Sequence, residues 1–130
     1  MPPSSVKRAT RVAEAVRAEL MDALLRGDLG NPALSGALVS TVRVTDDLSL
    51  ARVYMRHQVS DLSEAKKKAL VRAMAGARTM LRRRVGERVK IKRVPDLQFF
   101  WDDGADHALR VESLLAEIEQ ERRESGNDDE

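Results

Sequence analysis

Residues 38–56 read LVSTVRVTDDLSLARVYMR, and this stretch decides the class of fold. In 38–45, the apolar positions 38, 42 and 44 are expected to point to one side and Arg43 to the other, because strand side chains alternate. The second half alternates in the same way, with three apolar side chains on one face and three larger ones on the other: Ala51, Val53 and Met55 against Arg52, Tyr54 and Arg56. Aspartates at 46 and 47 favour a turn between the halves. The stretch therefore predicts an antiparallel hairpin with one buried face.

A helix is expected before the hairpin and a longer helical run after it. Apolar residues recur every four positions between Val6 and Arg26, and Gly27 is expected to end that helix. Asp61 and Glu64 have the spacing of a capping box, so the second run is expected to begin at Asp61. Apolar residues then keep helical spacing as far as 86, which is long for one helix of a small domain. We therefore expect two helices with a kink between residues 76 and 79.

A third strand is expected after these helices. Residues 88–93 alternate between inward-facing apolar residues and the outward-facing Lys90 and Lys92. Pro95 cannot donate a hydrogen bond to a sheet, so the strand is expected to bend there or to lie at an edge. The alternation resumes over 97–101.

The order of these elements indicates the domain organisation. Apolar spacing from about residue 106 to residue 118 predicts a short final helix. The chain is therefore expected to be α+β, a three-stranded sheet with helices on one face, in the α-β-β-α-α-β order of a type II KH domain. We expect this domain to span residues 6–118, with a flexible N-terminus at 1–5 and a disordered acidic tail at 123–130.

Composition and charge narrow the class of function. The chain has 130 residues, enough for one domain, and no cysteine, which excludes disulfides, zinc fingers and thiol nucleophiles. The sequence shows neither an apolar run of membrane-spanning length nor a secretory signal, so we expect a cytoplasmic protein with no membrane partner. The net charge of +2 hides an asymmetry, because residues 1–116 carry 21 bases and 14 acids whereas residues 117–130 carry two bases and seven acids.

The strongest functional signal is the segment 66–93, which holds twelve bases and one acid, Glu87. Binding to phosphates needs several cations on one surface, so this segment predicts a nucleic-acid partner. An ordinary solvated helix face is the alternative, but such a face normally carries compensating acids. We expect RNA and no DNA, bound by a monomer, because helix-turn-helix spacing and a dimer zipper are lacking. The candidate RNA-binding residues are Lys66, Lys67, Lys68, Arg72, Arg78, Arg82, Arg83, Arg84, Arg88, Lys90, Lys92 and Arg93.

Other sequence features point to weaker hypotheses. Tyr54, on the polar face of its strand, is placed either to stack on a base or simply to cover the sheet. The aspartate pairs at 46–47 and 102–103 allow a Mg²⁺-dependent nuclease, although adjacent acids usually form turns and helix caps. A protein scaffold that uses the acidic tail is a further alternative. Because nucleotide-binding and nucleophile motifs are lacking, we expect no enzyme, no cofactor and no metal site.

Three blocks of sequence, in order, resemble the bacterial ribosome-binding factor A family. They are RVAEAVRAEL at 11–20, TVRVTDDL at 41–48 with ARVY at 51–54, and RVPDLQF at 93–99 followed by Asp102. The resemblance implies a KH-like assembly factor that associates with the small (30S) ribosomal subunit and its 16S rRNA. It implies support of late assembly and of 5′-end maturation of that RNA, including in the cold, and release promoted by an assembly GTPase. A generic KH-like protein that binds other RNAs stays open as the alternative.

The resemblance also places a kink on particular residues. The family carries an Ala-x-Gly kink between its second and third helices, which corresponds here to Ala77, Arg78 and Thr79. Thr79 stands where the family has glycine, so this sequence departs from the pattern. The arginines at 78 and 82–84 flank the kink and remain available to phosphate in this interpretation.

Overall fold

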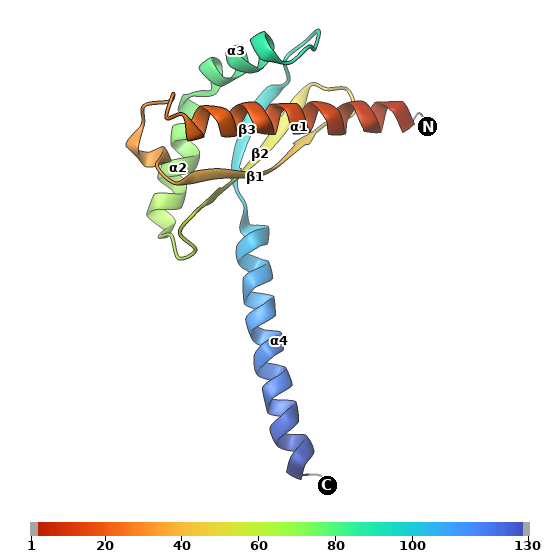
Figure 1. Cartoon of the computed structure of the whole chain (residues 1–130), viewed down its shortest axis with the longest axis vertical. Coiled ribbons are helices and arrows are strands. Elements are labelled where there is room, and N and C mark those ends of the chain that lie inside the picture. Colours follow the sequence, from red (N-terminus) through yellow and green to blue (C-terminus); the bar gives the residue numbers. More distant parts are fainter. Residues whose placement is uncertain (1–2, 129–130) are drawn as a thin grey trace.

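The computed structural model describes the backbone of residues 3–128 and the side chains of residues 7–104 and 114–124. Its elements follow the predicted order, with one short 3-10 turn added and a final helix that is longer than expected (Figure 1). They are α1 (Pro3–Leu25), the 3-10 turn η1 (Pro32–Leu34), β1 (Ala37–Val44), β2 (Leu50–His57), α2 (Glu64–Gly76), α3 (Arg78–Arg88), β3 (Asp96–Trp101) and α4 (Asp103–Asp128).

The three strands form one mixed sheet in the order β1-β2-β3. β1 and β2 are antiparallel, as the hairpin pattern predicts, whereas β2 and β3 are parallel. Val53 lies at the centre of the sheet, between Val42 and Phe99. A register shift between Val39 and Thr41 adds a bulge to β1. The bulge reverses the alternation before it, so Val39 is buried while Leu38 lies on the other face, and the prediction that Leu38 faces the core was wrong.

One face of the sheet and the three helices α1, α2 and α3 form the hydrophobic core. The inward residues of β2 and β3 are almost fully buried, and all buried side chains among the described residues are apolar. This confirms the predicted α+β class with helices on one face. α1 contributes the apolar stripe expected from the sequence, with Val12, Val16 and Leu20 buried. In α2 and α3 the buried residues are Leu70, Met74, Leu81 and Val85, of which only Leu81 belongs to the stripe expected there.

Local hydrogen bonds and backbone geometry fix the C-terminus of α1 and the N-terminus of α2. Gly27 has a φ of +68°, and the amides of Gly27 and Asp28 bond back to α1 carbonyls, so glycine ends the helix as expected. α2 begins at Glu64 rather than at Asp61. Its N-cap is Ser63, whose side chain accepts a hydrogen bond from the amide of Lys66.

The break between α2 and α3 lies at Ala77. This residue has φ −91° and ψ 5°, its amide bonds to carbonyls of α2, and its own carbonyl accepts from Leu81 in α3. The predicted kink is thereby confirmed in position. Because φ is negative there, alanine adopts this geometry without strain, and Thr79 lies within the first turn of α3.

The strand predicted at 88–93 was wrong. α3 continues through Arg88, and the segment 89–95 is a loop in which Val89 and Ile91 are half-buried against the edge of the core. Its apolar residues alternate with exposed ones, as in a strand, because only one side of the loop contacts the core. The strand begins only after the buried Pro95, where the amide of Asp96 bonds to the carbonyl of Ser49. Lys90 and Lys92 are therefore loop residues and do not lie on a strand.

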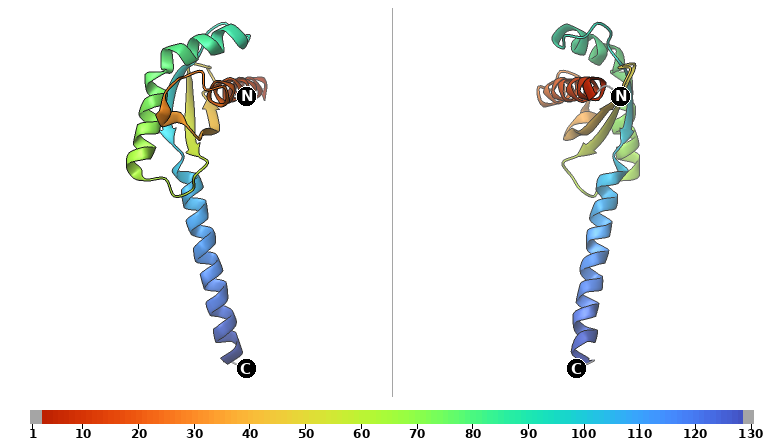
Figure 2. Two further views of the ribbon diagram at one scale, coloured as in Figure 1. Left: turned by 60° about the vertical axis from the view of Figure 1, so that its left-hand side comes forward. Right: turned by 90° about the vertical axis from the view of Figure 1, so that its right-hand side faces the viewer.

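The final helix is longer than expected. α4 runs to Asp128, so residues 123–128, expected to be disordered, are helical, and residues 129–130 lie outside the described part of the chain. Two further views show α4 leaving the end of β3 and extending away from the sheet (Figure 2). Neither α4 nor another described helix carries an apolar stretch of the length that a membrane span needs.

Candidate nucleic-acid interface

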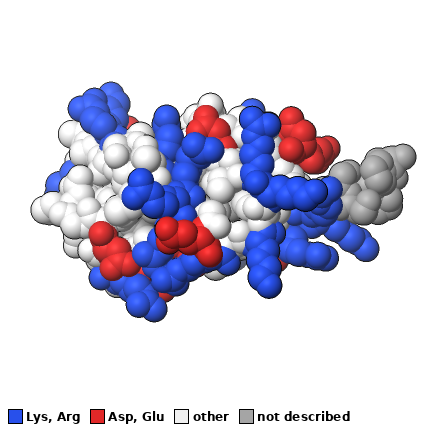
Figure 3. All heavy atoms as spheres, turned by 90° about the horizontal axis from the view of Figure 1, so that it is seen from above, with Lys and Arg blue, Asp and Glu red and all other residues white. Residues whose placement is uncertain are grey.

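The twelve predicted bases do not form one uniform surface. Seen from above, Lys and Arg side chains extend over much of the molecule, but Asp and Glu lie among them (Figure 3). The densest group of bases in this view lies toward the N-terminal end of α1. Several bases are therefore neutralised within the fold, and the interface has to be built from the others.

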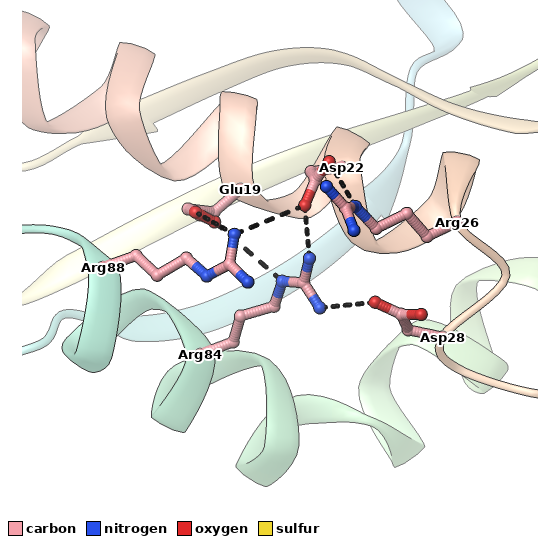
Figure 4. A network of polar contacts seen from close by, with 6 residues as sticks. All are labelled: Glu19, Asp22, Arg26, Asp28, Arg84 and Arg88. Atoms are coloured by element: carbon pink, nitrogen blue, oxygen red, sulfur yellow. Dashed lines mark hydrogen bonds and ion pairs between the residues drawn. The ribbon is translucent and has the colours of Figure 1, made fainter.

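Arg84 is held by carboxylates of α1 and of the loop that follows it. Its guanidinium donates to Asp28 at 2.7 Å and also to Asp22, and its Nε lies 3.9 Å from Glu19 (Figure 4). The hydrogen bond to Asp28 is the main reason why the pKa of Arg84 is raised. Only 17% of the Arg84 side chain is exposed. These contacts connect α3 to α1, so the role of Arg84 is structural.

Arg88 and Arg26 extend the same network, which we call the α1–α3 ion cluster (Glu19, Asp22, Arg26, Asp28, Arg84 and Arg88). Arg88 lies 3.8 Å from Glu19 and 3.7 Å from Asp22. Arg26 donates to Asp22 at 2.9 Å, and this bond is the largest contribution to the lowered pKa of Asp22. The cluster offsets the charge of two predicted RNA-binding residues, Arg84 and Arg88.

Two more of the twelve bases are engaged elsewhere. The guanidinium of Arg82 donates to the carbonyls of Val94 and Pro95 at 3.1 and 3.2 Å, which fixes the loop that enters β3. Lys67 lies 3.1 Å from Glu64 and 5.3 Å from the centre of the Trp101 ring. Only 14% of the Lys67 side chain is exposed, so it is largely covered by the fold.

The other eight bases have no ion pair or side-chain hydrogen bond to any described residue, and all are exposed. They fall into three groups by element. Three lie on α2, two on α3 and three on the loop after α3: Lys66, Lys68 and Arg72; Arg78 and Arg83; Lys90, Lys92 and Arg93. α2 packs beside η1, whereas the loop follows the far end of α3, so the α2 group is separated from the loop group (Figure 1).

The loop group lines a groove with two further bases that the sequence analysis missed. Arg8 and Arg11, one turn apart on α1, face Lys90, Lys92 and Arg93 across a hollow of about 440 Å³. We call this hollow the cationic groove. Its floor contains Val12 and Ile91, and the β1–β2 turn closes it with Asp47 and Leu48. All five bases are exposed and have no ion pair with a described residue, so they are free to bind an anion.

A second hollow lies at the break between α2 and α3. It has a volume of about 570 Å³, and its wall includes Gly76, Ala77 and Met80, with Arg72 as its one base among the described lining residues. Leu29 and Asn31, from the loop after α1, line the other side. The kink thus faces a mainly apolar hollow, whereas phosphate recognition needs several donors or cations.

One member of each aspartate pair considered for Mg²⁺ has a structural partner. Asp47 accepts from the hydroxyls of Thr45 and Ser49 at 2.7 and 2.8 Å and from the Ser49 amide at 3.1 Å, and the first of these is the main reason why its pKa falls to about 2. Asp102 accepts from Ser40 at 2.5 Å. Among the described residues, His, Asp and Glu side chains nowhere gather in a group of three suited to a metal ion. Asp47 therefore acts as a turn former.

The face of the sheet away from the helices carries an aromatic pair. Tyr54 of β2 and Phe100 of β3 are neighbours in the ladder, with ring centroids 5.6 Å apart and ring planes 29° apart. Tyr54 was predicted from the sequence as a candidate for base stacking, whereas Phe100 was not, although the alternation at 97–101 places Phe100 on the outer face. Phe100 is 39% exposed, which is high for a large apolar side chain.

Comparison with known proteins gives one family. A family model described as ribosome-binding factor A matches residues 8–115. The ribosome-binding factor A of Sorangium cellulosum is 46% identical over 113 residues, which cover 87% of this chain and 90% of that protein. The protein of the same name from Geotalea uraniireducens is 37% identical over 123 residues, covering 95% and 98% of the two chains.

A solved structure has the same fold. The crystal structure of ribosome-binding factor A from Thermus thermophilus superposes with a TM-score of 0.59 at 24% identity, over 71% of this chain and 93% of that one. The arrangement of three helices on a three-stranded sheet is therefore shared.

Proposed function

Because the chain belongs to the ribosome-binding factor A family, we propose that it binds the small ribosomal subunit through its 16S rRNA, and that the cationic groove makes the central contact. The groove supports this proposal because five unpaired cations from two segments far apart in sequence meet there. Five like charges with Asp47 as the one acid among the described lining residues repel one another in the free protein, and phosphates from the RNA backbone would neutralise them.

The other free bases extend the proposed contact. Arg78 and Arg83 lie on α3, which leads into the loop of the groove, while Lys66, Lys68 and Arg72 lie on α2. Arg82, Arg84 and Arg88 support the groove instead of binding RNA, because they hold the loop and α3 in place. This divides the twelve bases into eight that are proposed to contact RNA and four that maintain the fold.

In the cell, we propose a cytoplasmic, monomeric assembly factor that binds late precursors of the small subunit and supports 5′-end maturation of 16S rRNA, including in the cold. Release by an assembly GTPase belongs to the same proposal. The role is that of a binding protein and not of an enzyme. Its alternative, a KH-like protein for other RNAs, predicts absence from free small subunits in a gradient of cell extract.

The test compares double variants that each remove two positive charges. Lys90→Gln with Lys92→Gln alters the groove, and Arg122→Gln with Arg123→Gln on α4 is the matched control. Subunit binding is measured by co-sedimentation over a series of salt concentrations. The groove variant should bind more weakly and lower the slope of log affinity against log salt by about 1.5, since each lost phosphate contact removes about 0.7 to 0.9. An equal effect of both variants, or no effect of either, would refute the groove as the contact.

A further inference from the structure

The outer face of the sheet carries Arg43, Arg52, Tyr54, Arg56, Gln98 and Phe100, with Leu38 and Asp96 beside them. Its aromatic residues distinguish it from an ordinary solvated face. The chain has only four aromatic residues, and two of them lie here and not in the core. Neighbouring positions are exposed or half-buried, and α1, α2 and α3 all pack on the opposite side. Exposed apolar patches rimmed by polar residues often mark binding surfaces, and here two adjacent rings are rimmed by arginines.

The arginines of this face are arranged at a cost in stability. Arg43 and Arg52 are direct partners in the antiparallel ladder, so two positive charges face each other across the strands. Like charges in this position are destabilising. Neither side chain, nor that of Arg56, has an ion pair with any described carboxylate. An external anion would relieve this repulsion.

The spacing of the arginines and the aromatic rings on this face fits a nucleic-acid strand. Tyr54 lies between Arg52 and Arg56 on β2, with the aromatic row crossing to Phe100 on β3. Four residues of strand separate the two arginines by about 13 Å. Cations spaced along a strand, with aromatic rings between them, match a nucleic-acid strand whose phosphates meet the arginines and whose bases stack on the rings.

We propose that the outer face of the sheet binds unpaired nucleotides of RNA by stacking on Tyr54 and Phe100, with phosphates held by Arg43, Arg52 and Arg56. This surface is separate from the cationic groove, and it rests on the proposed function in taking RNA as the partner. It assigns the protein a preference for single-stranded RNA, because bases within a duplex present no free face to a ring.

The experiment measures the affinity of the full chain for a single-stranded RNA of about ten nucleotides and for a duplex RNA. Tyr54→Leu with Phe100→Leu removes both rings, and Tyr54→Phe is the control that keeps stacking. The double variant should bind single strands at least about 25-fold more weakly, since each lost stack weakens binding about fivefold or more, and should leave duplex binding unchanged. Arg43→Gln with Arg52→Gln should weaken both, and Tyr54→Phe neither.

Folding of each variant is checked by its circular dichroism and thermal midpoint, and the aromatic NMR resonances of Tyr54 and Phe100 are followed on addition of single-stranded RNA to the unaltered chain. Unchanged resonances, or an equal loss of single-strand and duplex binding in the folded ring variant, would overturn the inference. The inference would also be overturned if the ring variant lost subunit binding but kept its affinity for single-stranded RNA, because that result would point to a protein partner on this face. The proposed function fails by a different result, an unchanged salt slope in the Lys90 and Lys92 variant.

Discussion

Arg83 and Arg84 are adjacent in sequence, yet the structure assigns them opposite roles, and this can be tested by replacing each with methionine. Methionine keeps a long unbranched side chain and removes only the charge and the donors. Arg84→Met should destabilise the protein without removing a proposed RNA contact. Arg83→Met should weaken RNA binding and leave stability within about 0.5 kcal/mol of the unaltered chain.

The magnitude for Arg84 follows from its contacts. Its loss removes hydrogen bonds to Asp22 and Asp28 and leaves Glu19, whose side chain is only 14% exposed, with Arg88 alone. A hydrogen bond to a charged group contributes about 1.5 to 3 kcal/mol, but Asp22 and Asp28 are 33% and 41% exposed and become hydrated again. We therefore expect a net loss of about 2 kcal/mol, which lowers the thermal midpoint by about 6 to 10 °C.

The assay is urea unfolding at neutral pH, combined with RNA binding measured at a temperature where both variants are folded. Arg84→Met should shift the unfolding midpoint and leave the salt slope of binding unchanged, whereas Arg83→Met should lower that slope by about 0.7 to 0.9. Equal stability of the two variants would refute the structural role of the α1–α3 ion cluster. A reduced slope in Arg84→Met would refute the division of the bases.

Three further substitutions test local features. Gly76→Ala, where an added Cβ meets nothing within 4 Å, should raise the free energy of unfolding by about 0.5 to 1 kcal/mol and leave subunit binding unchanged, as shown by urea unfolding and co-sedimentation. Gly36→Ala should destabilise by more than about 1 kcal/mol in the same unfolding assay, because φ is +82° and the new Cβ would lie 2.7 Å from the ring of His57. In Asp47→Asn, the free energy of unfolding should depend less on pH below about pH 4 than it does in the unaltered chain. The folded pKa of Asp47, about 2, lies below the ordinary 3.8, so its contribution to stability is complete above about pH 4 and is lost as the pH falls through 2.

The hairpin and the helices were predictable because their patterns are local. Strand β2 alternates without interruption, and every inward residue read from the sequence is buried. β1 was only partly predictable, since its bulge at Val39 depends on the pairing with β2 and leaves no mark in the sequence of β1 alone. The loop 89–95 was mistaken for a strand because side chains that contact a core on one side also alternate over a short stretch. Pro95 was the informative signal there, and β3 begins directly after it.

The candidate site was predictable in composition but not in arrangement. The sequence shows many bases between 66 and 93. The carboxylates that bind Arg84, however, lie far from it in sequence: Asp22 in α1 is 62 positions away and Asp28 in the following loop is 56 positions away. Arg8 and Arg11 are not among the RNA-binding residues predicted from the sequence. Their one-turn spacing on an exposed face was a signal that they act together, but the loop that completes the groove with them is a tertiary feature.

Consecutive charges on a helix cannot all serve one surface, because each residue is rotated by about 100° from the one before. Arg82, Arg83 and Arg84 show the consequence: the first turns to the carbonyls of the loop, the second to solvent and the third to the acids of α1. High charge density along a helix therefore overstates its capacity to bind an anion. The bases of the cationic groove come from a helix and a loop that converge, so they oppose one another across a hollow that an anion can enter. Substitution of bases in the cationic groove should therefore change RNA binding alone, whereas substitution of all three arginines at 82–84 should change both binding and the stability of the fold.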